Sequence, residues 1–303
     1  MQIVEKTTEF RLPQRSAVAI GKFDGVHLGH RKLIHKIMER KAEGLIATVF
    51  TFDNSAAAFF GGEEKELTTI AEKRRIFEKL GVDVLIEFPL NRETAATKPD
   101  EFVRRYLAAQ MRAAYICAGT DLSFGRNGAG NYDLLKKYAD QYDYRTELID
   151  KVKVDGEPIS STGVRGAVRA GKMEDVTRML GIPYSVSGVV EHGKSLGRTI
   201  GMPTANIMPE KDKLLPPYGV YYSKAHIGGR IYRAISNVGS KPTVNAEDSV
   251  GVETYLYDFD GDLYGRDMTV ELLAFRRPEM KFDSVEQLRT HMEEDIAAGR
   301  VFE

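Results

Sequence analysis

The sequence predicts two domains of different class: an α/β domain built on a parallel sheet, and a small antiparallel β-barrel with one long helix. Its length of 303 residues suits two domains. Up to about residue 183, buried strand patterns alternate with amphipathic helical patterns, which is typical of a parallel sheet covered by helices. Beyond that point, short strand patterns alternate with tight turns, which is typical of a small barrel. We therefore expect domains at 1–183 and 184–303.

The elements of the first half alternate regularly along the chain. In the first helix, Leu33, Ile34, Ile37 and Met38 recur every three or four residues, opposite a charged face. The predicted strands lie at 16–20, 45–52, 82–87, 113–118 and 144–149, and the later helices at 70–80, 100–109 and 132–138. Because ligands bind beyond the carboxyl ends of parallel strands, the segments that follow these strands are candidate sites.

The pattern changes where two short helices, 163–170 and 173–180, lead to Gly181-Ile182-Pro183, a helix stop. Two hairpins are predicted after it. The first joins 218–227 to 230–236 through Gly228-Gly229, and the second joins 251–259 to 263–273 through Asp260-Gly261. Only 284–297 has the pattern of a long helix, so we expect a closed barrel plus one helix.

Composition excludes several classes of protein. Lys and Arg number 43 against 44 Asp and Glu, so the chain has no basic excess for a nucleic-acid backbone. Apolar stretches such as 45–52 are too short to cross a membrane. The charged N-terminus is unlike a secretory signal, and the single cysteine, Cys117, fits a reducing compartment. We expect a cytoplasmic protein without nucleic-acid or membrane partners; the oligomeric state is not predicted.

The first candidate site follows the strand at 16–20, in the segment Gly21-Lys22-Phe23-Asp24-Gly25-Val26-His27-Leu28-Gly29-His30. His27 and His30 are three residues apart, so they are neighbours in the first turn of the next helix. Free N–H groups and the positive helix end favour phosphate there, and two imidazoles could stabilise its charge. The alternative is a pair of surface or capping histidines. Zinc is not expected, because no third ligand is evident.

This segment resembles the His-x-Gly-His motif of nucleotidylyltransferases, and its context resembles the N-terminal module of prokaryotic bifunctional riboflavin kinase/FAD synthetases. Two more segments match that module: Gly119-Thr120-Asp121-Leu122-Ser123-Phe124-Gly125, and Ser160-Ser161-Thr162-Gly163-Val164-Arg165. The resemblance implies a Rossmann-like nucleotidylyltransferase domain in which His27 and His30 are catalytic. It also implies a nucleotide site made by Phe23, Gly25, Asp121, Gly125, Ser161, Thr162 and Arg165.

The second half resembles riboflavin kinases just as closely. Gly201-Met202-Pro203-Thr204-Ala205-Asn206 is similar to their Pro-Thr-Ala-Asn signature, and Val252-Glu253-Thr254 follows in family order. Neutral oxygens of Thr204 and Asn206 suit a Mg²⁺ that also binds phosphates and waters. Glu253 offers a carboxylate that could accept a proton from an attacking alcohol. The alternative for a glutamate in a barrel strand is a solvent-facing position.

A P-loop pattern, Gly188-Val189-Val190-Glu191-His192-Gly193-Lys194-Ser195, lies between these motifs. A P-loop must open a helix, whereas two glycines and a proline follow here, so we reject that interpretation. The segment 193–201 has instead the composition of a glycine-rich loop. The resemblance implies that Lys194, Gly197 and Arg198 contact nucleotide phosphates.

The resemblance covers about 16–297 and implies a bifunctional enzyme. The second domain would phosphorylate riboflavin to FMN with ATP and Mg²⁺, and the first would adenylylate FMN to FAD and release pyrophosphate. The family usually carries His-Pro after its second strand, where this chain has Asn54-Ser55-Ala56-Ala57. That departure leaves open a riboflavin kinase with a weakened or inactive first domain. A nucleotidylyltransferase for another acceptor and a flavin-sensing binding protein also stay open.

Overall fold

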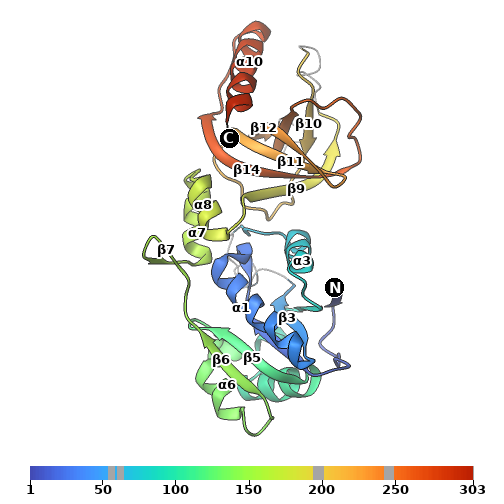
Figure 1. Ribbon diagram of the computed structural model, residues 1–303, viewed down its shortest axis with the longest axis vertical. Coiled ribbons are helices and arrows are strands. Elements are labelled where there is room, and N and C mark those ends of the chain that lie inside the picture. Colours follow the sequence, from blue (N-terminus) through green and yellow to red (C-terminus); the bar gives the residue numbers. More distant parts are fainter. Residues whose placement is uncertain (54–58, 60–64, 194–200, 242–248, 303) are drawn as a thin grey trace. The chain divides into compact units, whose positions relative to one another are not determined.

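The computed structural model describes residues 1–53, 59, 65–193, 201–241 and 249–302 (Figure 1). The chain divides into two compact units, Met1–Ser161 and Thr162–Glu303. The second unit therefore includes α8 (Met173–Leu180) and all but the first residue of α7 (Ser161–Arg169). The sequence patterns instead placed the domain boundary after these helices, at 183.

The first unit contains the predicted parallel sheet. Its strands lie in the order β1-β4-β3-β2-β5-β6, and all neighbouring pairs are parallel. They are β1 (Gln2–Glu5), β2 (Ser16–Ile20), β3 (Ile46–Phe52), β4 (Val84–Phe88), β5 (Ala113–Gly119) and β6 (Arg145–Ile149). The α/β class is confirmed. The edge strand β1, which pairs with β4, was not predicted.

Helices follow most of the strands. Those of the first unit are α1 (Leu28–Glu39), α3 (Ile70–Lys79), α4 (Arg92–Ala95), α5 (Pro99–Glu101) and α6 (Tyr132–Tyr138). The predicted helix at 100–109 is a π-helix over much of its length, η3 (Phe102–Gln110). Short 3₁₀ turns occur at η1 (Asp24–Val26), η2 (Arg40–Glu43) and η4 (Arg126–Gly128), and a two-stranded hairpin joins β7 (Lys153–Val154) to β8 (Glu157–Pro158).

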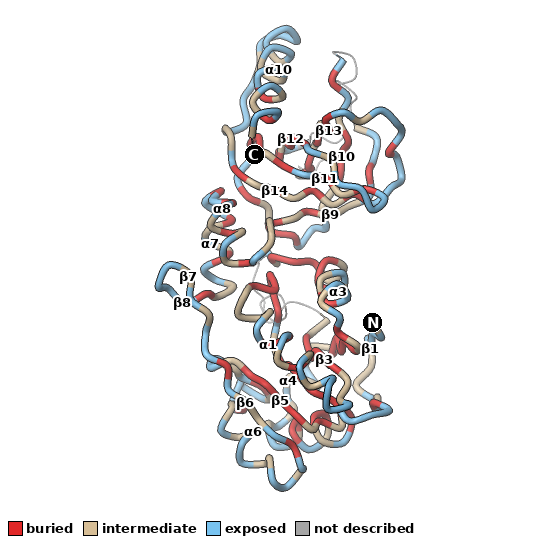
Figure 2. Tube along the Cα trace, in the orientation of Figure 1, coloured by how far each residue is buried: buried red, intermediate tan, exposed pale blue. Residues whose placement is uncertain are grey.

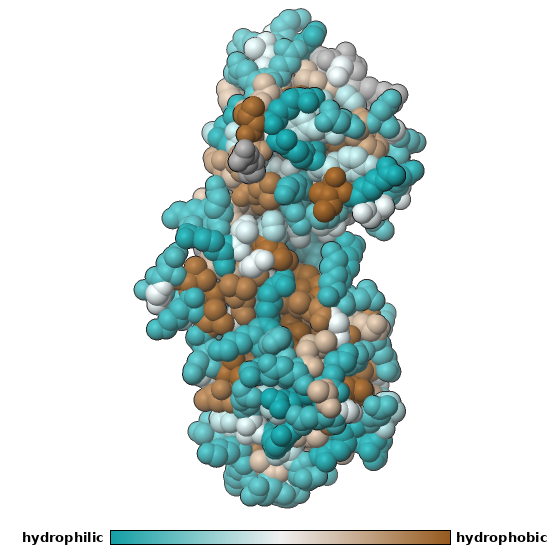
Figure 3. All heavy atoms as spheres, viewed as in Figure 1, coloured by the Kyte–Doolittle hydropathy of each residue, from teal (hydrophilic) through white to brown (hydrophobic). Residues whose placement is uncertain are grey.

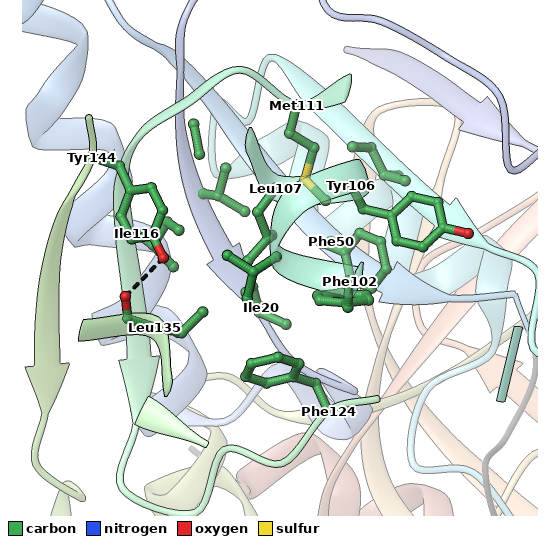
Figure 4. Packing of buried hydrophobic residues seen from close by; sticks show 14 of the residues in the cluster. Ile20, Phe50, Phe102, Tyr106, Leu107, Met111, Ile116, Phe124, Leu135 and Tyr144 are labelled. Atoms are coloured by element: carbon green, nitrogen blue, oxygen red, sulfur yellow. Dashed lines mark hydrogen bonds between the residues drawn. The ribbon is translucent and has the colours of Figure 1, made fainter. Parts of the chain in front are cut away.

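The central strands β2, β3, β4 and β5 are buried on both faces, whereas the edge strands β1 and β6 are exposed or only partly buried at most positions; Figure 2 shows this contrast between β5 and β6. Alternate residues of β2 enter different clusters, since Val18 belongs to one and Ala19 to the other. Figure 4 shows the first cluster, where Phe50 packs edge-on against Phe102 of η3. The Tyr144 hydroxyl donates to the carbonyl of Leu135 at 2.7 Å, which ties α6 to the end of the sheet.

The second unit contains a closed antiparallel barrel in the order β10-β13-β12-β11-β14-β9. Its strands are β9 (Tyr184–Glu191), β10 (Thr204–Ile207), β11 (Gly219–Ile227), β12 (Arg230–Lys241), β13 (Ser249–Leu256) and β14 (Asp267–Pro278). The hairpin at Gly228-Gly229 is confirmed. The hairpin at Asp260-Gly261 was wrong, because β13 pairs with β10 and β12 whereas β14 pairs with β11 and β9.

The predicted long helix is α10 (Val285–Val301), and polar contacts attach it to the barrel. Asp295 is 5% exposed and accepts hydrogen bonds from both Arg276 and Arg277 of β14. Arg233 of β12 donates to backbone carbonyls at the end of α10, including that of Gly299. The side of the helix seen in Figure 3 is largely hydrophilic. Among the described residues, no helix is both long and apolar enough to span a membrane.

Candidate active sites

The first candidate site lies where the strand order of the sheet reverses. The chain leaves β2 toward β3 on one side, and β5 pairs with β2 on the opposite side. Ligands of open parallel sheets bind at such a switch point, beyond the carboxyl ends of the strands. The segment 21–30 follows β2, and the segment 119–130 follows β5. The fold therefore brings the two predicted phosphate-site segments to neighbouring strand ends.

The turn after β2 has an unusual backbone. Phe23 has a φ of 50°, Gly25 of 79° and Val26 of 43°, all in the left-handed region. This conformation is costly for a β-branched residue, by about 1–3 kcal/mol, and such strain clusters at functional sites. Thr68 holds the turn: its hydroxyl accepts from the Gly25 N–H at 3.0 Å, and its N–H donates to the Asp24 carboxylate at 3.1 Å.

The two histidines lie together at the start of α1, as the motif predicted. Their rings are stacked, with centroids 3.7 Å apart and an interplanar angle of 15°. His27 is the N-cap residue, and its Nδ1 accepts from the backbone N–H of His30 at 3.3 Å. A neutral His27 ring therefore carries its proton on Nε2. The buried Nδ1 of His30 has no hydrogen-bond partner within the described parts of the chain.

Both rings are neutral at physiological pH. Burial lowers the pKa of His27 from 6.5 to about 4, against the opposing effect of the nearby Asp121 carboxylate. The pKa of His30 lies well below its usual value. Burial of the ring is the main cause, and the nearby His27 and Lys73 lower the pKa further. The pair can therefore donate hydrogen bonds from neutral imidazole N–H groups. This refines the sequence hypothesis, which did not specify the charge of the rings.

The neutrality of this pair predicts a particular pH dependence. A group with a lowered pKa stays deprotonated above that pKa, so these rings lose no proton between about pH 6.5 and 8.5. We expect kcat/KM for nucleotide turnover at this site not to fall over that interval. Measurement of the pH profile with saturating second substrate tests this. A decline of about tenfold per pH unit above 6.5 would show that imidazolium ions are required.

The turn after β5 supports the same site. Asp121 forms an ion pair with Lys151 at 3.0 Å, and both groups influence the pKa of His27, which places them near it. Gly125 has a φ of 69°, and a Cβ there would lie 2.9 Å from atoms of Pro99. Only glycine suits this position. Phe124 and Gly130 form a β-bridge that closes the loop.

The Ser-Ser-Thr segment begins helix α7. The Ser161 hydroxyl donates to the carbonyl of Asp24 at 3.0 Å, which joins it to the turn after β2. Arg165 lies one helical turn beyond Ser161, so the two share a face of α7. Thr162 is exposed and Arg165 is half-buried.

The second candidate site lies on the outer face of the barrel. In the strand register, Glu253 of β13 stands opposite Asn206 of β10 and Asn237 of β12. Directly opposed residues of antiparallel strands share a face, so these three side chains are neighbours. The Thr204 hydroxyl donates to Glu253 Oε1 at 2.5 Å. The motif residues Thr204, Asn206 and Glu253 are thus brought together.

A pocket of about 270 Å³ opens beside Glu253, between the barrel and α10. One end carries the polar side chains of Thr204, Asn237 and Glu253. The remaining walls are largely apolar, with the ion-paired Arg277 and Asp295 among them. The full lining is Thr204, Val220, Ile235, Ser236, Asn237, Glu253, Tyr255, Arg277, Glu279, Met280, Phe282, Leu288, Met292, Asp295 and Ile296. A pocket with apolar walls and a polar cluster around Glu253 suits a ring system that carries a hydroxylated chain.

Three predicted site residues, Lys194, Gly197 and Arg198, fall outside the described residues.

The apolar wall of the pocket beside Glu253 was not predicted from the sequence. Part of it comes from α10, where Leu288, Met292 and Ile296 recur at helical spacing. Asp295 lies on the same stripe of the helix. A carboxylate on an apolar face needs a cationic partner, so Asp295 was the sequence signal that this face of α10 packs against the barrel.

Comparisons with known proteins match the two halves of the chain to two families. A family model for FAD synthetase matches residues 10–163, and one for riboflavin kinase matches residues 180–302. A bifunctional riboflavin kinase/FMN adenylyltransferase of Listeria monocytogenes is 34% identical, over 98% of this chain and 95% of its own length. A protein of the same description from Bacillus subtilis is 33% identical, over 93% and 90% of the two chains.

A solved structure from Streptococcus pneumoniae has the same fold over its whole length. It is described as a macrolide-efflux protein, is 30% identical in sequence and has a TM-score of 0.88. The alignment covers 99% of each chain.

Proposed function

The chain belongs to the family of bifunctional riboflavin kinases/FMN adenylyltransferases, and we propose that it catalyses both reactions of that name. The barrel unit would convert riboflavin and ATP to FMN and ADP. The α/β unit would convert FMN and a second ATP to FAD and pyrophosphate. One observation carries this proposal: the stacked His27–His30 pair lies in the α/β unit, and the Glu253 cluster with its pocket lies in the barrel unit, so each unit holds a group suited to one half-reaction.

In the kinase reaction, the 5′-hydroxyl oxygen of riboflavin attacks the γ-phosphorus of ATP. The bond from that phosphorus to the β-γ bridging oxygen breaks, and ADP leaves with its electron pair. The Glu253 carboxylate accepts the hydroxyl proton. The hydrogen bond from Thr204 holds that carboxylate at the polar end of the pocket. The apolar wall of Met280, Phe282 and Leu288 would pack against the flavin ring.

The donor set at this end of the pocket fits Mg²⁺. Thr204 and Asn206 provide neutral oxygens and Glu253 provides a carboxylate, and magnesium prefers oxygen ligands combined with phosphates and waters. Thr204 and Asn206 are the residues that would hold it. When bound, the ion supplies neutralisation of the negative charge on the nucleotide phosphates.

In the second reaction, a phosphate oxygen of FMN attacks the α-phosphorus of ATP. The bond from that phosphorus to the α-β bridging oxygen breaks, and pyrophosphate leaves with the electrons. The Nε2–H of His27 can donate to phosphate oxygens, and so can the N–H groups at the start of α1. Ser161 and Arg165 are proposed to bind phosphates as well. No covalent enzyme intermediate is needed.

Chromatography of the flavins tests the proposal. The full chain is incubated with riboflavin, Mg²⁺ and ATP, and we expect FMN followed by FAD. FMN alone would favour a kinase with an inactive first unit. If riboflavin stays unchanged but binds, the protein is a flavin sensor instead.

Because ATP is the co-substrate of both steps, we also infer that the protein acts in the cytoplasm.

The kinase activity should reside in the barrel unit alone. We expect a fragment of residues 162–303 to make FMN at a rate close to that of the full chain. A fragment of 184–303 lacks α8, whose Met173, Val176 and Leu180 are buried. Loss of such side chains costs about 1.5–3 kcal/mol each, so the shorter fragment should melt at a lower temperature. Melting curves and FMN assays of both fragments check this; an inert but folded longer fragment contradicts it.

A further inference from the structure

Lys73 is a buried lysine that lacks an acidic partner among the described residues. It is only 6% exposed and lies near the start of α3. Within the part of the chain that the structure describes, no carboxylate or other acceptor forms an ion pair or hydrogen bond with its ammonium. Lysine is rarely buried unless it is paired, because burial of a lone charge costs several kcal/mol.

The position of Lys73 on α3 adds to this cost. Thr69 caps the helix through a capping box with Glu72, so Lys73 follows immediately at the positive end of the helix dipole. A cation is unfavourable there, whereas an anion is favoured. The helix end and the lysine together form a region of positive potential. An anionic ligand would balance it.

The surroundings of Lys73 connect it to the histidine site. Thr68, just before α3, holds the strained turn after β2 through its bonds to Asp24 and Gly25. Phe77, one helical turn beyond Lys73, packs edge-on against Phe23, with ring centroids 5.6 Å apart. Phe23 in turn contacts the ring of His30, with centroids 5.1 Å apart. The start of α3 is therefore attached to the turn that carries the histidine pair.

The charges at this site are divided among different residues. Both histidines are neutral and supply only hydrogen bonds. Lys151 is already paired with Asp121 at 3.0 Å. Lys73 acts on His30 and lowers its pKa, so its charge lies close to that ring. A full positive charge is thus present beside the histidines, and no acidic side chain of the described residues cancels it.

We propose that Lys73 is a further phosphate-binding residue of this site, and that its ammonium contacts the β- and γ-phosphates of ATP that leave as pyrophosphate. The proposal rests on the assignment of adenylyl transfer to the first unit. A cation on the leaving group stabilises the charge that develops as the α-β bond breaks. A second source of the same phosphate chemistry is FMN, whose phosphate is the nucleophile.

Lys73→Met in the full chain tests this, because methionine keeps the length and apolar stem but removes the charge. We expect kcat/KM for ATP in FAD formation to fall about 10²-fold, and KM for pyrophosphate in the reverse reaction to rise. KM for FMN and FMN formation should stay unchanged. Lys79→Met, which changes an exposed lysine on the same helix, is the matched control.

Two physical readouts do not depend on turnover. Inorganic pyrophosphate should raise the melting temperature of the wild type and of Lys79→Met, but not that of Lys73→Met. Without ligand, Lys73→Met should melt at the wild-type temperature or above it, because an unpaired buried charge has been removed.

The outcomes separate this inference from the assignment on which it rests. A wild type that makes no FAD from FMN and ATP overturns the assignment itself. If the wild type makes FAD, three results overturn only the role of Lys73. These are normal FAD formation by Lys73→Met, an effect confined to KM for FMN, and a lower melting temperature with equal loss of both activities.

Discussion

Glu253→Gln should reduce FMN formation at least about 10²-fold and leave FAD formation from supplied FMN unchanged. Glutamine has the size of glutamate, and its amide oxygen can still accept the hydrogen bond from Thr204. The substitution therefore keeps the side chain in place but removes the group that takes the proton. General-base contributions are about 10²–10⁴-fold, and the loose transition state of phosphoryl transfer favours the lower end of that range.

The kinetic pattern identifies the role more closely than the rate alone. Loss of a base lowers kcat, whereas binding of riboflavin and ATP should stay near the wild-type affinity. Glu293→Gln, at an exposed glutamate of α10 that does not line the pocket, is the matched control and should behave as wild type. Assays of both half-reactions on each purified variant check this. Normal kinase turnover by Glu253→Gln removes the residue from the base role, and loss of both activities indicates misfolding.

Much of the fold could be predicted because local pattern and tertiary environment agree. The strand at 16–20 was predicted to its residue bounds, since five consecutive apolar or small residues become buried on both faces. The hairpin at Asp260-Gly261 failed for the opposite reason. Its turn signal is local, but β14 uses both of its edges to close the barrel against β11 and β9. Barrel closure depends on pairings that no local pattern encodes.

The residues of the candidate sites also differ in how far the sequence alone could predict that they lie together. His27 and His30 are three residues apart, so sequence spacing alone places them together. Glu253 and Asn206 are distant in sequence, and only the family resemblance linked them before the strand register did. Lys73 was missed, although it lies on the same helical stripe as Phe77. A lysine on an apolar stripe was the available signal, because such a position requires burial of its charge or an anionic partner.

The double substitution of His27 and His30 by alanine should abolish most FAD formation and spare FMN formation. Loss of one preorganised donor costs about 10²–10³ in rate, so loss of both rings should exceed that range unless they act as a single unit. His35→Ala is the matched control, because His35 lies on α1 with a side chain that is 75% exposed. Rates of both half-reactions, measured on the full chain, check the expectation.

His27 also has a structural role, which a further variant separates from its chemistry. As the N-cap of α1, its Nδ1 accepts the backbone N–H of His30, and loss of a cap costs about 0.5–2 kcal/mol. His27→Asn restores an N-cap acceptor but removes the imidazole N–H from the phosphate site. If the imidazole acts on phosphate, His27→Asn should keep the wild-type melting temperature and still lose FAD formation. If the capped variant instead recovers FAD formation, the histidine serves only to start the helix. An equal loss of kinase activity in a folded double mutant would show that these residues have been assigned to the wrong reaction.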